Sequence, residues 1–232
     1  MEPTADRFVQ HAVLLTVTTG LVEAVSLLAL GPAFTAMQTG DVLFLAFGAA
    51  GEGGLSLVAP GASLAGFAVG TAAGAGLERR LQAHRHRWFR ISLCVEALLV
   101  CVAAFTVWGL DRSGGMPTAR HVTGTAILAV AMGIRGVTAM RVAVPGVPTT
   151  LVTRTMTAFI GGSLLHDAAL AHGRRVGTRR ALAMLAMFAG GLAGALLLRS
   201  GRSATVVLLV AAAMIVAIAA LHLRLTTREP AG

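Results

Sequence analysis

The sequence predicts an all-α fold: a polytopic transmembrane helical bundle of two inverted repeats, with six spans and two re-entrant segments. Three observations lead to this fold class. Of the 232 residues, 56% are hydrophobic and 12% are charged, against roughly 25% charged in ordinary soluble domains. Similar segments recur in the two halves of the chain. Arginines crowd two of the polar connections, and such clusters mark the cytoplasmic side of a membrane protein.

Six apolar stretches are long enough to cross a bilayer, which takes about 20 residues. They cover residues 8–30, 60–77, 91–110, 121–143, 180–198 and 203–223. Two shorter stretches, 33–50 and 149–165, each follow a span after only a few residues. Gly31-Pro32 precedes the first, and the segment 144–148, with two prolines and a glycine, precedes the second. Because these residues break helices, we expect both short stretches to enter the membrane and turn back.

The chain divides into two related halves, 1–112 and 114–232, within a single transmembrane domain covering 1–232. Segments 20–32 and 133–145 both begin with glycine and end with proline, at an offset of 113 residues. In each half a threonine-bearing segment, a glycine-rich span and a last apolar span follow in the same order. This shared order predicts an internal repeat.

The glycine-rich spans carry glycines four residues apart, a spacing that lets helices approach each other closely. The glycines concerned are Gly66, Gly70 and Gly74 in the first half, and Gly190 and Gly194 in the second. We expect these positions to be sites of helix packing.

The arginines decide the topology. Five lie in the connection 79–90 and four in 174–180, so both connections should be cytoplasmic. Three apolar stretches separate them, and three full crossings would place them on opposite sides. If both short stretches are re-entrant, twelve arginines lie inside and four outside, and the two halves are inverted, a plan that recurs in transporters. Eight full crossings are the alternative, and they violate the arginine rule.

This topology predicts a multi-pass protein of the bacterial inner membrane with cytoplasmic N- and C-termini. The net charge of +9 comes from short clusters between apolar stretches, which indicates contact with lipid headgroups rather than nucleic acid. We expect the lipid bilayer and a small polar solute or ion as partners, with a homo-oligomer compatible with the sequence. No cofactor and no nucleic acid are expected.

Two short patterns, one in each half, are typical of a known family. The first comprises Gly20, Glu23, Ala24, Ser26, Phe34 and Thr39-Gly40-Asp41, and the second Ala131-Met132-Gly133, Thr149-Thr150 and Val152-Thr153. In both, the chain resembles the YoaK-like family of bacterial inner-membrane proteins, a multi-span family whose domain has no known function. Where that family has neutral Asn, Gln and Gly, this chain has Asp41, Arg135 and Arg154.

Ionisable residues within apolar stretches are costly and usually face a bundle interior or an aqueous cavity. Here they are Glu23, Asp41, Glu96, Arg135, Arg141 and Arg154. The offset of 113 maps position 41 onto 154, so we expect Asp41 and Arg154 to meet near the midplane, as a structural ion pair or as part of a permeation path. Glu96 is expected near the surface, close to Arg90. Arg141 is expected to reach the cytoplasmic surface.

Glu23 is expected to accept hydrogen bonds from the backbone around Thr39 and Gly40, or alternatively to bind a proton or cation. The threonines of the second short stretch either satisfy broken backbone or line a polar path. The candidate pathway residues are therefore Glu23, Thr39, Gly40, Asp41, Arg135, Thr150, Thr153 and Arg154. The histidines have no ligand spacing within a helix, so we expect no metal site and no catalytic site.

These residues predict a transporter or channel for a small polar solute or ion, with a midplane site at the two broken segments. A non-transporting membrane scaffold or partner subunit is the alternative, and a membrane-embedded enzyme ranks third.

Overall fold

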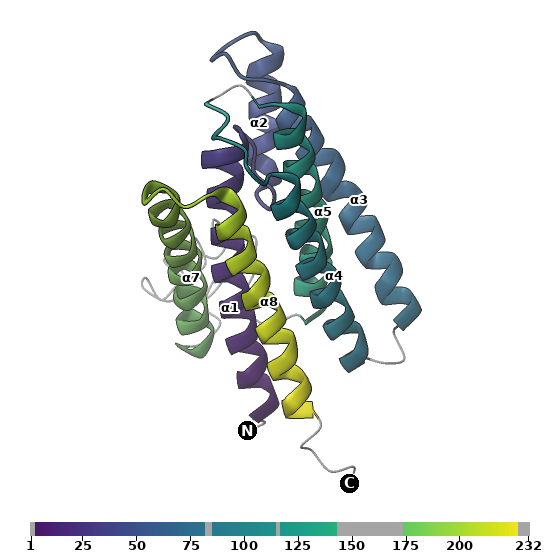
Figure 1. Ribbon diagram of the computed structural model, residues 1–232. Coiled ribbons are helices and arrows are strands. Elements are labelled where there is room, and N and C mark those ends of the chain that lie inside the picture. Colours follow the sequence, from purple (N-terminus) through teal and green to yellow (C-terminus); the bar gives the residue numbers. More distant parts are fainter. Residues whose placement is uncertain (1–2, 82–84, 115–116, 143–173, 227–232) are drawn as a thin grey trace.

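Helices make up all the regular structure in the part of the chain described by the computed structural model, residues 3–81, 85–114, 117–142 and 174–226. Figure 1 shows them as one bundle. In order they are α1 (Pro3–Val25), the π-helix η1 (Ser26–Leu30), α2 (Gln38–Ala49), α3 (Val58–Leu81), α4 (Arg85–Thr106), α5 (Ala119–Val142), α7 (Arg174–Arg199) and α8 (Ala204–Thr226). Within these residues, six helical segments are long and apolar enough to cross a membrane. The predicted polytopic helical bundle is confirmed.

Successive long helices alternate in direction. Helices α1 and α4 begin, and α3 and α8 end, at one end of the bundle, the lower end in Figure 1, which we call the terminal end. Helix α5 ends and α7 begins at that same end. The α2–α3, α4–α5 and α7–α8 connections lie at the opposite end, which we call the distal end. Arg79 and Arg80 at the end of α3 and Arg179 and Arg180 near the start of α7 therefore share the terminal end.

Helix α2 lies beside α3 and adds no crossing. It has 12 residues and is about 18 Å long at ~1.5 Å per residue, whereas the hydrocarbon core of a bilayer is about 30 Å thick. Helices α1 and α3, which precede and follow α2 along the chain, run in opposite directions. The chain leaves η1 at Gly31, whose φ of 144° favours glycine, and re-enters a helix at Gln38. The second short stretch, 149–165, lies outside the described residues.

Helices α3 and α5 approach each other through glycines. A Cβ at Gly66 would lie 2.6 Å from the carbonyl oxygen of Ala126, and one at Gly70 would clash with the carbonyl oxygen of Val130. On the facing helix, a Cβ at Gly133 would lie 2.7 Å from the Thr71 nitrogen. Side chains at these glycines would therefore force the two helices apart. Gly74, one turn further along, is in looser contact with α5.

Helices α1 and α7 are joined in the same manner. A Cβ at Gly20 would lie 2.5 Å from the backbone nitrogen of Gly191, and one at Gly190 would clash with the carbonyl oxygen of Val17. A Cβ at Gly194 would lie 2.7 Å from that of Ala24. The bundle thus contains two glycine-mediated helix pairs, α1 with α7 and α3 with α5, while α4 and α8 pack against each other.

Candidate functional site

The helical structure is interrupted between η1 and α2, at residues 31–37, which we call the break. Glu23, in the last turn of α1, binds the backbone of this segment. Glu23 Oε1 accepts hydrogen bonds from the Thr35 nitrogen (2.9 Å), Thr35 Oγ1 (2.7 Å) and the Ala36 nitrogen (2.6 Å). The side chain is only 5% exposed. The expected donors around Thr39 and Gly40 were wrong, because α2 already begins at Gln38 and the Gly40 amide donates to Met37 within the helix start. The backbone available to Glu23 therefore lies earlier in the break.

Asp41 binds the same break from the first turn of α2. It is completely buried, and its Oδ1 accepts a hydrogen bond from the Phe34 nitrogen at 2.8 Å. A carboxylate in this position is favoured by the dipole of the helix it begins. Gly40 leaves room for the Phe34 ring, since a Cβ there would lie 2.6 Å from Phe34 Cδ2. Glu23 and Asp41 together bind the three consecutive amides of residues 34–36.

Neutral side chains satisfy the carbonyl groups of the break. Ser26 Oγ donates to the Ala33 carbonyl at 2.8 Å, and Ser63 Oγ, from α3, donates to the Phe34 carbonyl. Gln38 Nε2 donates to the Thr35 carbonyl at 2.8 Å. Buried backbone groups need such partners, so α1, α2 and α3 jointly hold the break in one conformation.

Three buried acceptor oxygens of this region have no hydrogen-bond partner among the described residues: Glu23 Oε2, Asp41 Oδ2 and Gln38 Oε1. We call the region formed by Glu23, Asp41, Gln38 and residues 31–37 the break site. It contains the predicted residues Glu23, Thr39, Gly40 and Asp41. The predicted partners Thr150, Thr153 and Arg154 lie outside the described residues, so the contact between Asp41 and Arg154 stays a prediction.

Arg135 lies in a different polar centre, where it binds Glu96. Arg135 Nε is 2.9 Å from both carboxylate oxygens of Glu96, and Nη2 also donates to Oε1. Both side chains are 1% exposed. The expectation that Glu96 lies near the surface was wrong, because it stands 11 positions, about 16 Å, beyond the start of α4 at Arg85 and faces the bundle interior.

The rest of the Arg135 guanidinium is bound by α1. Nη1 donates to the Leu15 carbonyl and to Thr19 Oγ1 (3.0 Å), and Nη2 donates to Thr18 Oγ1 (3.0 Å). The Arg135–Glu96 centre therefore joins α1, α4 and α5. Sequence reasoning missed this pair, although one signal was present: Glu96 and Arg135 are the most deeply placed charges of two consecutive spans, and charges at such depth are usually paired.

Arg141 belongs to a third, peripheral pair. Its Nη2 lies 3.0 Å from Glu78 Oε2, and the arginine side chain is 56% exposed. Helix α5 ends one residue later, at the terminal end. This placement agrees with an arginine that extends to the membrane surface.

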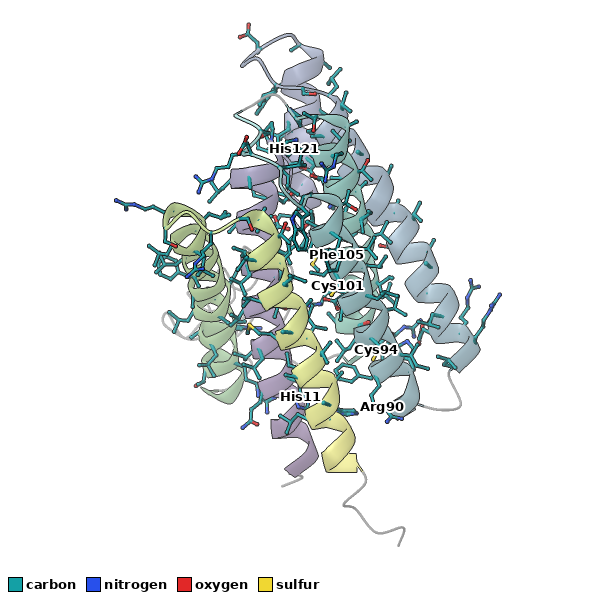
Figure 2. All side chains as sticks on the ribbon, in the orientation of Figure 1. His11, Arg90, Cys94, Cys101, Phe105 and His121 are labelled. Atoms are coloured by element: carbon teal, nitrogen blue, oxygen red, sulfur yellow. The ribbon has the colours of Figure 1, made fainter. Side chains whose placement is uncertain are left out.

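A cavity of about 230 Å³ opens at the distal end, next to η1. Its lining includes Ala29 and Leu30 of η1, the polar residues Asp111, Arg112 and His121, and Arg202 and Ser203 before α8. His121 braces its wall, accepting from the Thr118 nitrogen at 3.1 Å and contacting the Asp111 carbonyl at 2.8 Å. Figure 2 shows His121 at the distal end, far from His11. Glu23 and Asp41 are not among the residues that line this cavity.

Comparisons with known proteins identify a family. A family model described as a protein of unknown function (DUF1275) matches residues 11–221, which include the break site and the Arg135–Glu96 centre. No curated protein and no solved structure matches the chain. The match covers most of the chain, and the chain therefore belongs to the DUF1275 family.

Proposed function

We propose that this protein is a transporter or channel for a small polar solute or ion, and that the solute binds at the break site. One observation carries the proposal: Glu23 and Asp41 are buried inside an apolar bundle, yet within the described part of the chain each keeps one carboxylate oxygen without a hydrogen-bond partner. Ionisable residues buried in membrane bundles commonly belong to ion or substrate pathways. Irregular backbone at membrane depth is tolerated where it is buried in protein or lines a cavity.

We further propose that the halves 1–112 and 114–232 are inverted repeats. The correspondence pairs α1 with α5, α3 with α7 and α4 with α8, and the members of each pair run in opposite directions in Figure 1. The first helix of each half packs on the glycine-rich helix of the other half. Gly20 and Gly133, which are 113 residues apart, both face glycines across these contacts. In transporters built this way, substrates bind near the midplane where the repeats meet.

The terminal end is proposed to face the cytoplasm of a bacterium. The arginines of α3 and α7 gather at that end, whereas the distal end holds Arg112, Arg120, Arg199 and Arg202. An excess of arginine marks the cytoplasmic side. The YoaK-like resemblance supports the assignment to an inner membrane.

Water access at the break tests the proposal without knowledge of the solute. In a background with Cys94 and Cys101 replaced by Ala, a single cysteine is placed at Ala36, which is buried in the break. A membrane-impermeant methanethiosulfonate reagent is then added to each side of sealed vesicles. Ala36→Cys should react from at least one side, because a transported solute must reach the break from water. Ala211→Cys, at a fully buried core position of α8, serves as the control and should not react.

The Arg135–Glu96 centre favours a second candidate, a membrane scaffold or partner subunit that transports nothing. Its groups are paired and bound to three helices, as in a centre that only holds helices together. If Ala36→Cys reacts from neither side while a cysteine at the exposed position Glu52 does, the break is dry. The scaffold would then be the better account, and transport would be rejected.

A further inference from the structure

The unpaired oxygens of the break site indicate what it binds. In both Glu23 and Asp41, one oxygen accepts from the backbone and the other, buried one has no donor among the described residues. The Ser63 hydroxyl, which also interacts with the Asp41 carboxyl, donates to the Phe34 carbonyl. An ionised carboxylate that is buried without full hydrogen bonding is strongly disfavoured, and such a group neutralises itself where it can. A proton added to the unpaired oxygen removes the charge and leaves the existing hydrogen bonds of the other oxygen intact.

The two carboxylates also oppose each other's ionisation. They bind adjacent amides of residues 34–36, so two acidic groups lie close together in one buried site. Two carboxylates that share one site are difficult to ionise together. Added positive charge, up to one for each carboxylate, is therefore favourable at the break site.

Among the described residues, the charged groups of the surrounding elements do not supply this positive charge. On α5, Arg135 is committed to Glu96, Arg120 donates to the Thr106 and Trp108 carbonyls, and Arg141 pairs with Glu78. On α3 the charges Glu78, Arg79 and Arg80 stand at the terminal end, with the neutral Ser63 at the break. In the α4–α5 connection, Arg112 donates to the Leu198 carbonyl and both nitrogens of His121 are engaged. Arg199 of α7 is in the last turn of its helix at the distal end. Arg154, which the repeat offset aligns with position 41, is the competing cation.

A proton fits the described geometry better than a metal ion. Calcium and magnesium require six or more oxygen ligands in a defined arrangement, whereas the break site offers three unpaired oxygens. A proton needs only one of them. Uptake forms an O–H bond on a carboxylate oxygen with a proton from water, and release returns it to water, with no oxidation or reduction.

We propose that Glu23 and Asp41 are proton-binding residues, which take up protons on Oε2 and Oδ2 and release them as the protein transports its solute. The inference rests on the proposed function for its role in transport. Proton binding itself is a property of the break site and can be measured separately. Glu23 and Asp41 are then the residues through which a proton gradient acts on transport.

Infrared difference spectroscopy tests the inference on the whole protein in lipid. Spectra are recorded between neutral and alkaline pH, and the carbonyl stretch of protonated carboxylic acids is followed. The wild-type protein should show this band at neutral pH. Glu23→Gln and Asp41→Asn should each remove about half of it, because each deletes one of two acids. Glu78→Gln, which alters the carboxylate paired with Arg141, should leave the band unchanged.

The outcomes separate the two proposals. Absence of the band in the wild-type protein overturns proton binding, and this result needs no variant to fold. A band that persists in Asp41→Asn but is lost in Glu23→Gln shows that Asp41 is ionised, as pairing with Arg154 requires, and overturns the Asp41 half. Carboxylate bands that shift on addition of sodium chloride identify an alkali cation instead. If the band is found and Ala36→Cys is unreactive, proton binding stands and transport fails.

Discussion

Two buried polar centres lie about one turn apart along α1 and are built differently. In the Arg135–Glu96 centre, all three guanidinium nitrogens donate and both carboxylate oxygens accept. In the break site, two carboxylates of like charge each keep one unpaired oxygen. A fully connected buried network rigidifies the elements that it joins, so the first centre fixes α1, α4 and α5. The second retains free binding capacity, as a site for a solute or proton must.

The two centres also differ in what holds them. Arg135 and Glu96 meet across helices that are already formed, so their pairing stabilises tertiary contacts. Glu23 and Asp41 instead bind the amides of a non-helical segment and replace the hydrogen bonds that a continuous helix would have made. Removal of a charge should therefore lower the stability strongly in the Arg135–Glu96 centre and only mildly in the break site. Removal of a hydrogen-bond acceptor should lower the stability in both.

The largest effect is expected for Glu96→Ala. The change leaves the Arg135 guanidinium buried without a counter-charge, and breaking one side of a buried pair costs about 3–5 kcal/mol. Equilibrium unfolding of the purified protein in mixed micelles measures the free energy. Arg135→Ala should behave similarly. A loss below about 1 kcal/mol for both variants would mean that the pair is hydrated and that the contrast between the centres is false.

Glu23→Ala ranks next, with a matched Glu23→Gln variant. Alanine leaves the Thr35 and Ala36 amides without acceptors, at a cost of about 1–3 kcal/mol for unsatisfied buried donors. Glutamine keeps an acceptor oxygen and only loses the ability to ionise, so it should cost clearly less in the same unfolding measurement. Equal losses in the two variants would show that the negative charge itself stabilises the break, against the contrast drawn with Glu96.

Sequence reasoning reached these two centres to different degrees, for physical reasons. The direction of the helices follows from where arginines stand, and the close contacts at Gly70 and Gly190 follow from small residues one turn apart. The pairing of Glu96 with Arg135 depends on the rotation and depth of two packed helices, which composition does not encode. Glu23 could be assigned to the break from the sequence. Its hydrogen-bond donors were predicted around Thr39 and Gly40 but are residues 35 and 36, because the sequence does not show where α2 begins.

Ser63→Ala should have a smaller effect, confined to the break. It removes the hydrogen bond from Ser63 Oγ to the Phe34 carbonyl, worth about 1 kcal/mol for a neutral buried pair. Ser56→Ala, which changes an exposed serine hydrogen bonded to the Val58 amide, is the control and should cost less. Hydrogen exchange of the amides of residues 34–36 measures the local opening. Unaltered exchange in Ser63→Ala would show that α3 does not hold the break.

Glu78→Gln should have the smallest effect on stability and sets the lower limit of the comparison. The Glu78 side chain is 10% exposed, but its partner Arg141 is 56% exposed, and ion pairs in contact with solvent contribute about 0–1 kcal/mol. Water and lipid headgroups can replace Glu78 at the terminal end, whereas nothing can replace Glu96 in the bundle interior. The ratio of the losses in free energy of unfolding for Glu78→Gln and Glu96→Ala, measured under identical micelle conditions, therefore reports how deeply each ion pair is buried. A loss in Glu78→Gln as large as in Glu96→Ala would indicate that Arg141 is buried in the membrane-embedded protein and would require a different placement of the terminal end.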